Sequence, residues 1–204
     1  MSFQTQTLRE FNNHLAAREP VPGGGGVSAL VGALAAALAS MVAQYTCGKK
    51  AYLHVESDMK QYIDELALLR SKMLDLIDED AHAFSLFDGV YDLPKGSEQR
   101  TVALHHAAAS ALEPPARMIE ILSEISYIVE KLADTGATTL ASDTVCAAYC
   151  LQAAIQCALV NVGVNAEILP EGHVVHEYVE ILKQQTHQVV ARMDVCIEKI
   201  SHEQ

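Results

Sequence analysis

Apolar and polar residues alternate along this chain with the period of an α-helix. The longest pattern runs from His54 to Tyr91 and carries charged residues on its opposite face. Shorter amphipathic stretches predict helices at 7–18, 97–112, 115–134 and 173–200. Pro114 and Pro115 are expected to separate the helix at 97–112 from the helix at 115–134. The apolar stripe of the longest pattern consists of Met59, Ile63, Leu66, Met73, Ile77, Phe84 and Tyr91.

Two long stretches, Val27–Tyr45 and Thr144–Ala166, carry no charged side chain. Each is long enough to cross a membrane, so a membrane protein stays an alternative. In the first stretch, small and large residues form separate rows four positions apart, which favours a helix buried on all sides in a helical protein. The small row is Ser28, Gly32, Ala36 and Ser40, and the large row is Leu30, Leu34, Leu38 and Val42.

Together these elements predict a single domain over residues 1–204. Its fold is a multihelical all-α bundle in which amphipathic helices surround two central apolar helices. A chain of this length would struggle to surround both central helices completely. We therefore expect a homodimer that covers one of them.

The composition narrows the function classes. With 26 acidic against 14 basic residues, the net charge of -12 argues against nucleic-acid binding and, more weakly, against anionic membranes. The five cysteines have no zinc-site spacing, so we expect reduced thiols, no bound metal and a cytoplasmic protein. The N-terminus does not have the pattern of a signal peptide.

Two carboxylates are candidates for chemistry. Asp80 follows the apolar stripe, three residues after Ile77, so it needs a donor, a cation or a water-filled pocket. It is either an interior salt bridge or hydrogen bond, or a carboxylate with a raised pKa that transfers protons. Asp143, next to Ser142, opens the second uncharged helix and is either a helix cap or a second functional carboxylate.

A glycine run, Gly23–Gly26, leads into the first uncharged helix. It is either a flexible turn or a place where backbone N–H groups approach a ligand. Neither the phosphate-loop nor the dinucleotide-binding motif is present. Lys49 and Lys50 follow Gly48 at the end of the first uncharged helix. Cations stabilise a helix C-terminus, and glycine is common as the residue just after it.

Four segments occur in order: "PVPGGGGVSALVGALAAALASMVAQYTCGKKAY", "LIDEDAHAF", "ASDTVCAA" and "NVGVN". Together they resemble the methenyltetrahydrofolate cyclohydrolase and formimidoyltetrahydrofolate cyclodeaminase family, which includes the cyclodeaminase half of formiminotransferase-cyclodeaminase. The resemblance covers about 11–200. It implies a dimeric all-α domain that acts on a folate substrate without metal, nucleotide or other cofactor.

The resemblance and the residues together give an expected site. We expect the amino ends of the two uncharged helices to frame one folate pocket. Asp143 is the first-choice base or cation partner, and Asp80 is the alternate or shares a proton with it. The expected substrate-binding residues are Pro22, Gly23, Gly24, Gly25, Gly26, Ser28, Lys49, Lys50, Ser142 and Asn161.

Three functions stay open. The first is hydrolysis of 5,10-methenyltetrahydrofolate to 10-formyltetrahydrofolate, favoured because no transferase domain is fused in these 204 residues. The second is formimidoyltetrahydrofolate cyclodeamination with release of ammonia. The third is an inactive helical folate-binding or interaction module, because Gly136–Leu140 lacks the Gly-Asn-x-Asn type segment that relatives commonly carry.

Overall fold

The computed structural model describes residues 2–202, and within that range the chain forms helices and no strand. This confirms the all-α prediction. The helices are α1 Leu8–Leu15, α2 Gly24–Thr46, α3 Glu56–Ser85, α4 Glu98–Thr135, α5 Ala141–Ala166 and α6 Val175–His202, with short 3-10 turns at Lys50–Val55, Val90–Asp92 and Thr138–Leu140.

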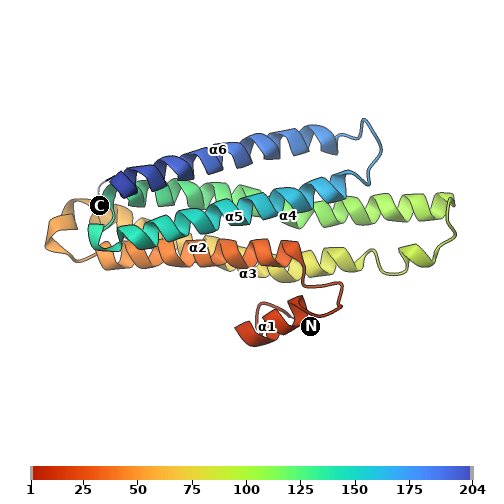
Figure 1. The fold of residues 1–204 in the computed structure, drawn as a ribbon, viewed down its shortest axis with the longest axis horizontal. Helices are drawn as coiled ribbons and strands as arrows, with labels where there is room; N and C mark the ends of the chain where they lie inside the picture. The colour runs from red at the N-terminus through yellow and green to blue at the C-terminus, as the bar shows by residue number, and fades with distance from the viewer. Residues whose placement is uncertain (1, 203–204) are drawn as a thin grey trace.

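The five long helices lie side by side along the long axis of the molecule, as Figure 1 shows. The helix α2 packs against α3, α4 and α5, and α5 packs against α2, α4 and α6. The two uncharged helices therefore pair inside the bundle, as expected. They run in opposite directions: Gly24 at the start of α2 lies against Asn161 near the end of α5, and Thr46 at the end of α2 accepts a hydrogen bond from the Ala137 N–H just before α5.

The uncharged helix α2 is fully buried along its small-residue row, whereas its large-residue row ranges from buried Val42 to exposed Leu34. Ser28, Gly32, Ala36 and Ser40 are buried, and a Cβ on Gly32 would lie 2.5 Å from Met73 Cε. Leu34 in the large row is 49% exposed, so the expectation of burial on all sides is wrong.

Like α2, the segment Thr138–Ala166 is long and apolar enough to cross a membrane. In the most apolar stretch of each, 61% of the α2 residues are buried but only 39% of those in Thr138–Ala166 are. The amphipathic helices therefore surround α2 better than α5, which keeps an exposed apolar face.

The helix α4 continues through Pro114 and Pro115, so the predicted break there is wrong. A proline at position 115 has no N–H for the Ala111 carbonyl four residues earlier. The side chain of Asn165 replaces it, because its Nδ2 donates to the Ala111 oxygen at 2.9 Å. A donor from α5 thus satisfies a carbonyl that the proline leaves free, and the helix continues.

The helix α3 ends at Ser85, earlier than its apolar pattern predicts. The chain then turns at Gly89, whose φ of 75° lies in the left-handed region. The stripe is buried or partly buried from Met59 to Ile77, whereas Phe84 and Tyr91 are 42% and 64% exposed. The last part of α3 therefore leaves the core, and Asp80 lies at the transition.

Candidate active site

Asp80 lies against the first turn of α2. The Gly26 N–H donates a hydrogen bond to its carboxylate. A Cβ built on Gly25 would lie 2.1 Å from Asp80 Oδ1, so only glycine allows the carboxylate to come this close. The glycine run thus forms the N-terminus of α2, and the Asp80 carboxylate lies against it. Free N–H groups and the helix dipole stabilise an anion at such a position.

A cavity of about 150 Å³ opens beside this carboxylate. Among the described residues that line it, Asp80 is the only one with an ionisable side chain. The rest are apolar groups, glycines and two amides, so nothing positively charged neutralises the carboxylate from within the cavity. The lining consists of Pro20, Val21, Gly23, Gly24, Gly25, Asp80, Phe84, Ala111, Asn161, Val164 and Asn165.

Burial raises the pKa of Asp80 to about 6, and the hydrogen bond from the Gly26 N–H opposes that rise. The sequence left two alternatives for Asp80: an interior salt bridge or hydrogen bond, and a carboxylate that transfers protons. The interhelical hydrogen bond is present, but Asp80 forms no ion pair with the residues between 2 and 202. A carboxylate with a pKa near neutrality can take up and release a proton during a reaction.

Two amides complete the polar part of the cavity. Asn161 Nδ2 donates to the Cys157 carbonyl of its own helix at 2.8 Å, and this amide lies 3.2 Å from where a Cβ on Gly24 would be. Asn165, one turn later, carries the hydrogen bond that supports α4. The sequence prediction included Asn161 but missed Asn165, although its four-residue spacing from Asn161 on one helix was a usable signal.

Two expected ligand residues serve the fold. Ser28 is fully buried, and its hydroxyl donates to the Ala154 carbonyl at 2.8 Å, which joins α2 to α5. Ser28 does not line the cavity beside Asp80, and its expected role in substrate binding stays a prediction. Pro22 is also buried, and it packs beside Gly26, 3.4 Å from where a Cβ on that glycine would lie.

The remaining expected residues lie at the other end of the bundle. Asp143 precedes Asn161 by eighteen residues on α5, which is about 27 Å along the helix. Asp143 and Asp80 of one chain therefore cannot share a proton, and the expectation that both amino ends frame one pocket within a chain is wrong. The opposite directions of α2 and α5 are the physical reason. Ser142, Lys49 and Lys50 lie at the same distant end.

Asp143 is not the cap of α5. The helix starts at Ala141, after an N-terminal cap at Leu140 that has no side-chain hydrogen bond. The half-buried Asp143 side chain forms no hydrogen bond or ion pair with the part of the chain that the structure describes. Gly48 does take the left-handed conformation after α2, with φ 74°, as its sequence position predicted.

The segment that departs from the family pattern, Gly136–Leu140, is held by side chains near the end of α2. Besides Thr46, the Tyr52 hydroxyl accepts from the Thr138 N–H at 3.1 Å, and Lys49 Nζ donates to the Thr139 hydroxyl at 3.3 Å. A Cβ on Gly136 would lie 2.6 Å from the Leu132 oxygen. The segment is thus held in place without the amide side chains that the resemblance led us to expect there.

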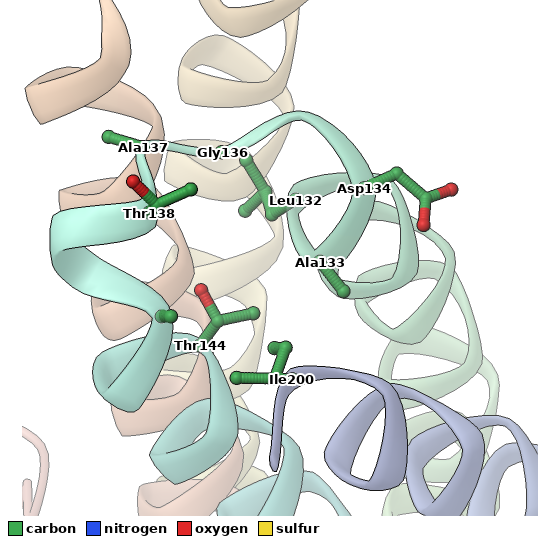
Figure 2. Close-up of a pocket in the computed structure, with 9 residues that line it drawn as sticks. Leu132, Ala133, Asp134, Gly136, Ala137, Thr138, Thr144 and Ile200 are labelled. Carbon is green, nitrogen blue, oxygen red and sulfur yellow. The ribbon is translucent and has the colours of Figure 1, made fainter. Parts of the chain in front are cut away.

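A second cavity of about 150 Å³ adjoins this segment between the ends of α4, α5 and α6. Figure 2 shows Thr144 and Ile200 on its floor and the Asp134 carboxylate turned away from them. Asp134 pairs with Lys199 at 2.5 Å. Because no unpaired ionisable group among the described residues lines this cavity, the Asp80 cavity is the better candidate for catalysis.

The comparisons with known proteins agree with this architecture. A family model described as formiminotransferase-cyclodeaminase matches residues 7–184. Methenyltetrahydrofolate cyclohydrolase from Methylorubrum extorquens is 35% identical over 170 residues, which cover 81% of this chain and 82% of that protein. Formimidoyltransferase-cyclodeaminase from Rattus norvegicus is 36% identical over 163 residues, and these span 78% of this chain but only 30% of the rat protein.

A solved structure shows the same fold. The crystal structure of formiminotetrahydrofolate cyclodeaminase from Thermotoga maritima superposes with a TM-score of 0.78 at 32% identity, and the match covers 98% of this chain and 96% of that one. Sequence and fold therefore point to the same group of proteins. The chain belongs to the formiminotransferase-cyclodeaminase family.

Proposed function

We propose that this chain hydrolyses 5,10-methenyltetrahydrofolate to 10-formyltetrahydrofolate, with Asp80 as the general base. The observation that carries the proposal is a carboxylate with a pKa near 6 in a cavity whose described lining residues include no cation. The substrate supplies the missing positive charge, because its one-carbon bridge between N5 and N10 is an amidinium cation. The similarity to the M. extorquens cyclohydrolase extends over most of both chains and supports this choice.

The chemistry follows from the charge of Asp80. With a pKa of about 6, the carboxylate is mostly ionised at neutral pH and attracts the bridging carbon. It takes a proton from a water molecule as the water oxygen bonds to that carbon. The protonated carboxyl then returns the proton to N5 as the carbon–N5 bond breaks. The hydroxyl on the one-carbon unit loses its proton to solvent and becomes the formyl oxygen, so the formyl group stays on N10. The net reaction consumes water and releases one proton.

The cavity also suggests how the substrate lies. A volume of about 150 Å³ holds part of a folate, not all of it. The planar ring would enter against the glycine backbone of 23–25, where no side chain intervenes. The rest would leave across Phe84 and Val164, which line the cavity and are 42% and 58% exposed.

Cyclodeamination is the second candidate, and the T. maritima cyclodeaminase, matched over 96% of its length, favours it. In that reaction N10 attacks the formimino carbon and ammonia leaves. The same carboxyl, once protonated, would give its proton to the departing nitrogen. One assay separates the two: methenyltetrahydrofolate loses its absorbance on hydrolysis, whereas formiminotetrahydrofolate gains it and releases ammonia.

The third candidate is an inactive folate-binding or interaction module. The main argument for this candidate was the missing amide side chains of Gly136–Leu140. That argument is weaker now, because other hydrogen bonds hold the segment in place. We expect turnover of one of the two folates above the spontaneous rate. Tight folate binding with no turnover of either would instead establish the inactive module.

We further propose that the protein is a cytoplasmic homodimer which binds neither membrane nor nucleic acid and requires no metal or other cofactor. The exposed face of α5 supports dimerisation, because a second copy would cover apolar surface that the chain leaves open. Purification without detergent followed by light scattering tests this. A detergent requirement would favour the membrane alternative, and a monomer would reject the dimer.

A further inference from the structure

Two amide side chains line the Asp80 cavity with oxygens that have no partner. Asn161 and Asn165 both belong to the lining, and their hydrogen bonds to other described residues go through the amide nitrogens. Both oxygens also keep contact with solvent, because the fully buried side-chain oxygens without a partner in residues 2–202 belong to Gln6 and Gln185. A polar ligand in the cavity can therefore reach both amide oxygens.

Backbone carbonyls fix the direction of these amides. Asn161 Nδ2 donates to the Cys157 oxygen at 2.8 Å, and Asn165 Nδ2 donates to the Ala111 oxygen at 2.9 Å. A carbonyl oxygen only accepts hydrogen bonds, so the nitrogen of each amide must face it. The amide oxygen cannot change places with the nitrogen without the loss of that bond. Each side chain therefore presents an acceptor in a fixed direction.

The direction of the Asn165 amide depends on the proline pair in α4. Pro115 has no N–H, so the Ala111 carbonyl is free to accept from a side chain. Ala111 lines the same cavity as Asn165. The bond that lets α4 continue through its prolines thus also orients an amide of the candidate active site.

The amides lie across the glycine run from Asp80. The helix α2 packs against α3, which carries Asp80, and against α5, which carries both asparagines. A Cβ on Gly25 would meet the Asp80 carboxylate, whereas a Cβ on Gly24 would meet the Asn161 amide. A flat ring that rests on the glycine backbone therefore has the carboxylate near one edge and the amides near the other.

A folate carries hydrogen-bond donors at the edge that would face the amides. Its pteridine ring has an amino group at C2 and an N–H at N3, at the far end of the ring system from the one-carbon bridge. With the bridge carbon at Asp80, these two donors point toward the amide side of the cavity. Amide oxygens accept hydrogen bonds from such groups, and a donor left without an acceptor there would weaken binding.

We propose that Asn161 and Asn165 determine the specificity for this edge of the ring, because their side-chain oxygens accept hydrogen bonds from the C2 amino group and from N3–H. The assignment rests on the proposed function, which places the bridge carbon at Asp80. A ring with an oxo group at C2 is rejected, since an oxygen takes the place of a donor and faces an amide oxygen.

The first test compares two ring fragments on the wild-type protein. Pterin and lumazine have the same ring system, with an amino group at C2 in pterin and an oxo group in lumazine. Ligand-observed NMR titration measures the affinity of each and does not depend on turnover. We expect pterin to bind at least about 10-fold more tightly than lumazine. Equal affinities, or no pterin binding at millimolar concentration, would overturn the proposal.

Variants separate recognition from a structural role. Asn161→Ala should weaken pterin binding about 10-fold, and the double variant Asn161→Ala, Asn165→Ala should bind pterin and lumazine with nearly equal, weak affinities. Gln156→Ala is the matched control, because Gln156 Nε2 donates to the Gln152 oxygen four residues earlier on α5 at 2.9 Å but does not line the cavity. Its affinities should equal those of wild type.

The ratio of the two affinities decides between the roles. If the asparagines only support the helices, the double variant loses affinity for both fragments and keeps the wild-type ratio, which would overturn the proposal. A ratio that falls toward one supports it. If wild type prefers pterin but turns over neither folate, the proposed function fails while the recognition of the ring edge stands.

Discussion

Replacing Asp80 by Asn should make the protein more stable at neutral pH. Burial raises the pKa of Asp80 from an ordinary 3.8 to about 6, so the folded state disfavours the ionised form that the unfolded chain accepts. Between pH 4 and 6 the folded protein holds more protons at this site, and its stability falls as the pH rises. Above pH 6 the full penalty is present.

The size of the penalty follows from the pKa. A rise of about two pK units corresponds to about 3 kcal/mol at most. Because the carboxyl is only half-buried and faces an open cavity, we expect about 2 kcal/mol of added stability in Asp80→Asn at pH 8. The asparagine oxygen can still accept the Gly26 N–H, so the variant keeps that hydrogen bond. Below pH 4 the difference from wild type should approach zero.

Asp78 supplies the matched control on the same helix. Burial works to raise the pKa of Asp78, but hydrogen bonds from Ser2, Phe3 and Gln4 outweigh burial and lower it. Its ionised form therefore stabilises the folded protein above about pH 4, and this contribution is lost as the pH falls through the lowered pKa. Asp78→Asn should thus lose stability at neutral pH, by about 1 kcal/mol.

Urea unfolding between pH 4 and 8 measures both effects. We expect the gain of Asp80→Asn over wild type to grow from pH 4 to pH 6 and then to level off. The loss in Asp78→Asn should instead stay nearly constant from pH 5 to pH 8, because the lowered pKa of Asp78 changes stability only at more acidic pH. An Asp80→Asn protein that is less stable than wild type at pH 8, or a gain that does not change with pH, would refute the reasoning.

Two further predictions concern the same end of the bundle, and a third concerns metal. Gly25→Ala should lower turnover at least 10-fold, because its Cβ would lie 2.1 Å from Asp80 Oδ1; Gly163→Ala, with nothing within 4 Å, is the control for alanine in a helix and should keep wild-type turnover. Asn165→Ala should cost about 1–3 kcal/mol in urea unfolding, because it leaves the Ala111 carbonyl without a donor, and an unchanged midpoint would contradict this. Turnover should be unchanged after dialysis against a chelator. Turnover that is lost on dialysis and regained when zinc is added would show a metal requirement.

The sequence predicted the helical fold because its signals are local. Apolar spacing and uncharged runs located the long helices, although α4 was predicted as two. Asp80 stood out because it continues the apolar stripe after Ile77. The error at Pro114–Pro115 has a distant cause, since the missing N–H is replaced by Asn165, fifty-four residues away from Ala111. No local rule anticipates such a donor.

The site was only half predicted, for a related reason. Composition identifies which helix ends carry glycine, lysine or aspartate, but helix direction in the bundle decides which ends meet. Because α2 and α5 run in opposite directions, the glycine end of α2 faces Asn161 instead of Asp143. The apolar residues that shape the cavity, such as Phe84 and Val164, look like ordinary core positions in the sequence.

Turnover of methenyltetrahydrofolate by the Asp80→Asn variant, measured beside Asp78→Asn, tests the role of Asp80 most directly. We expect Asp80→Asn to lose about 100-fold or more while remaining folded, because the base is gone. Asp78→Asn should keep the wild-type rate, since that carboxylate holds the N-terminal segment and does not line the cavity. A folded Asp80→Asn protein with wild-type turnover would contradict the account.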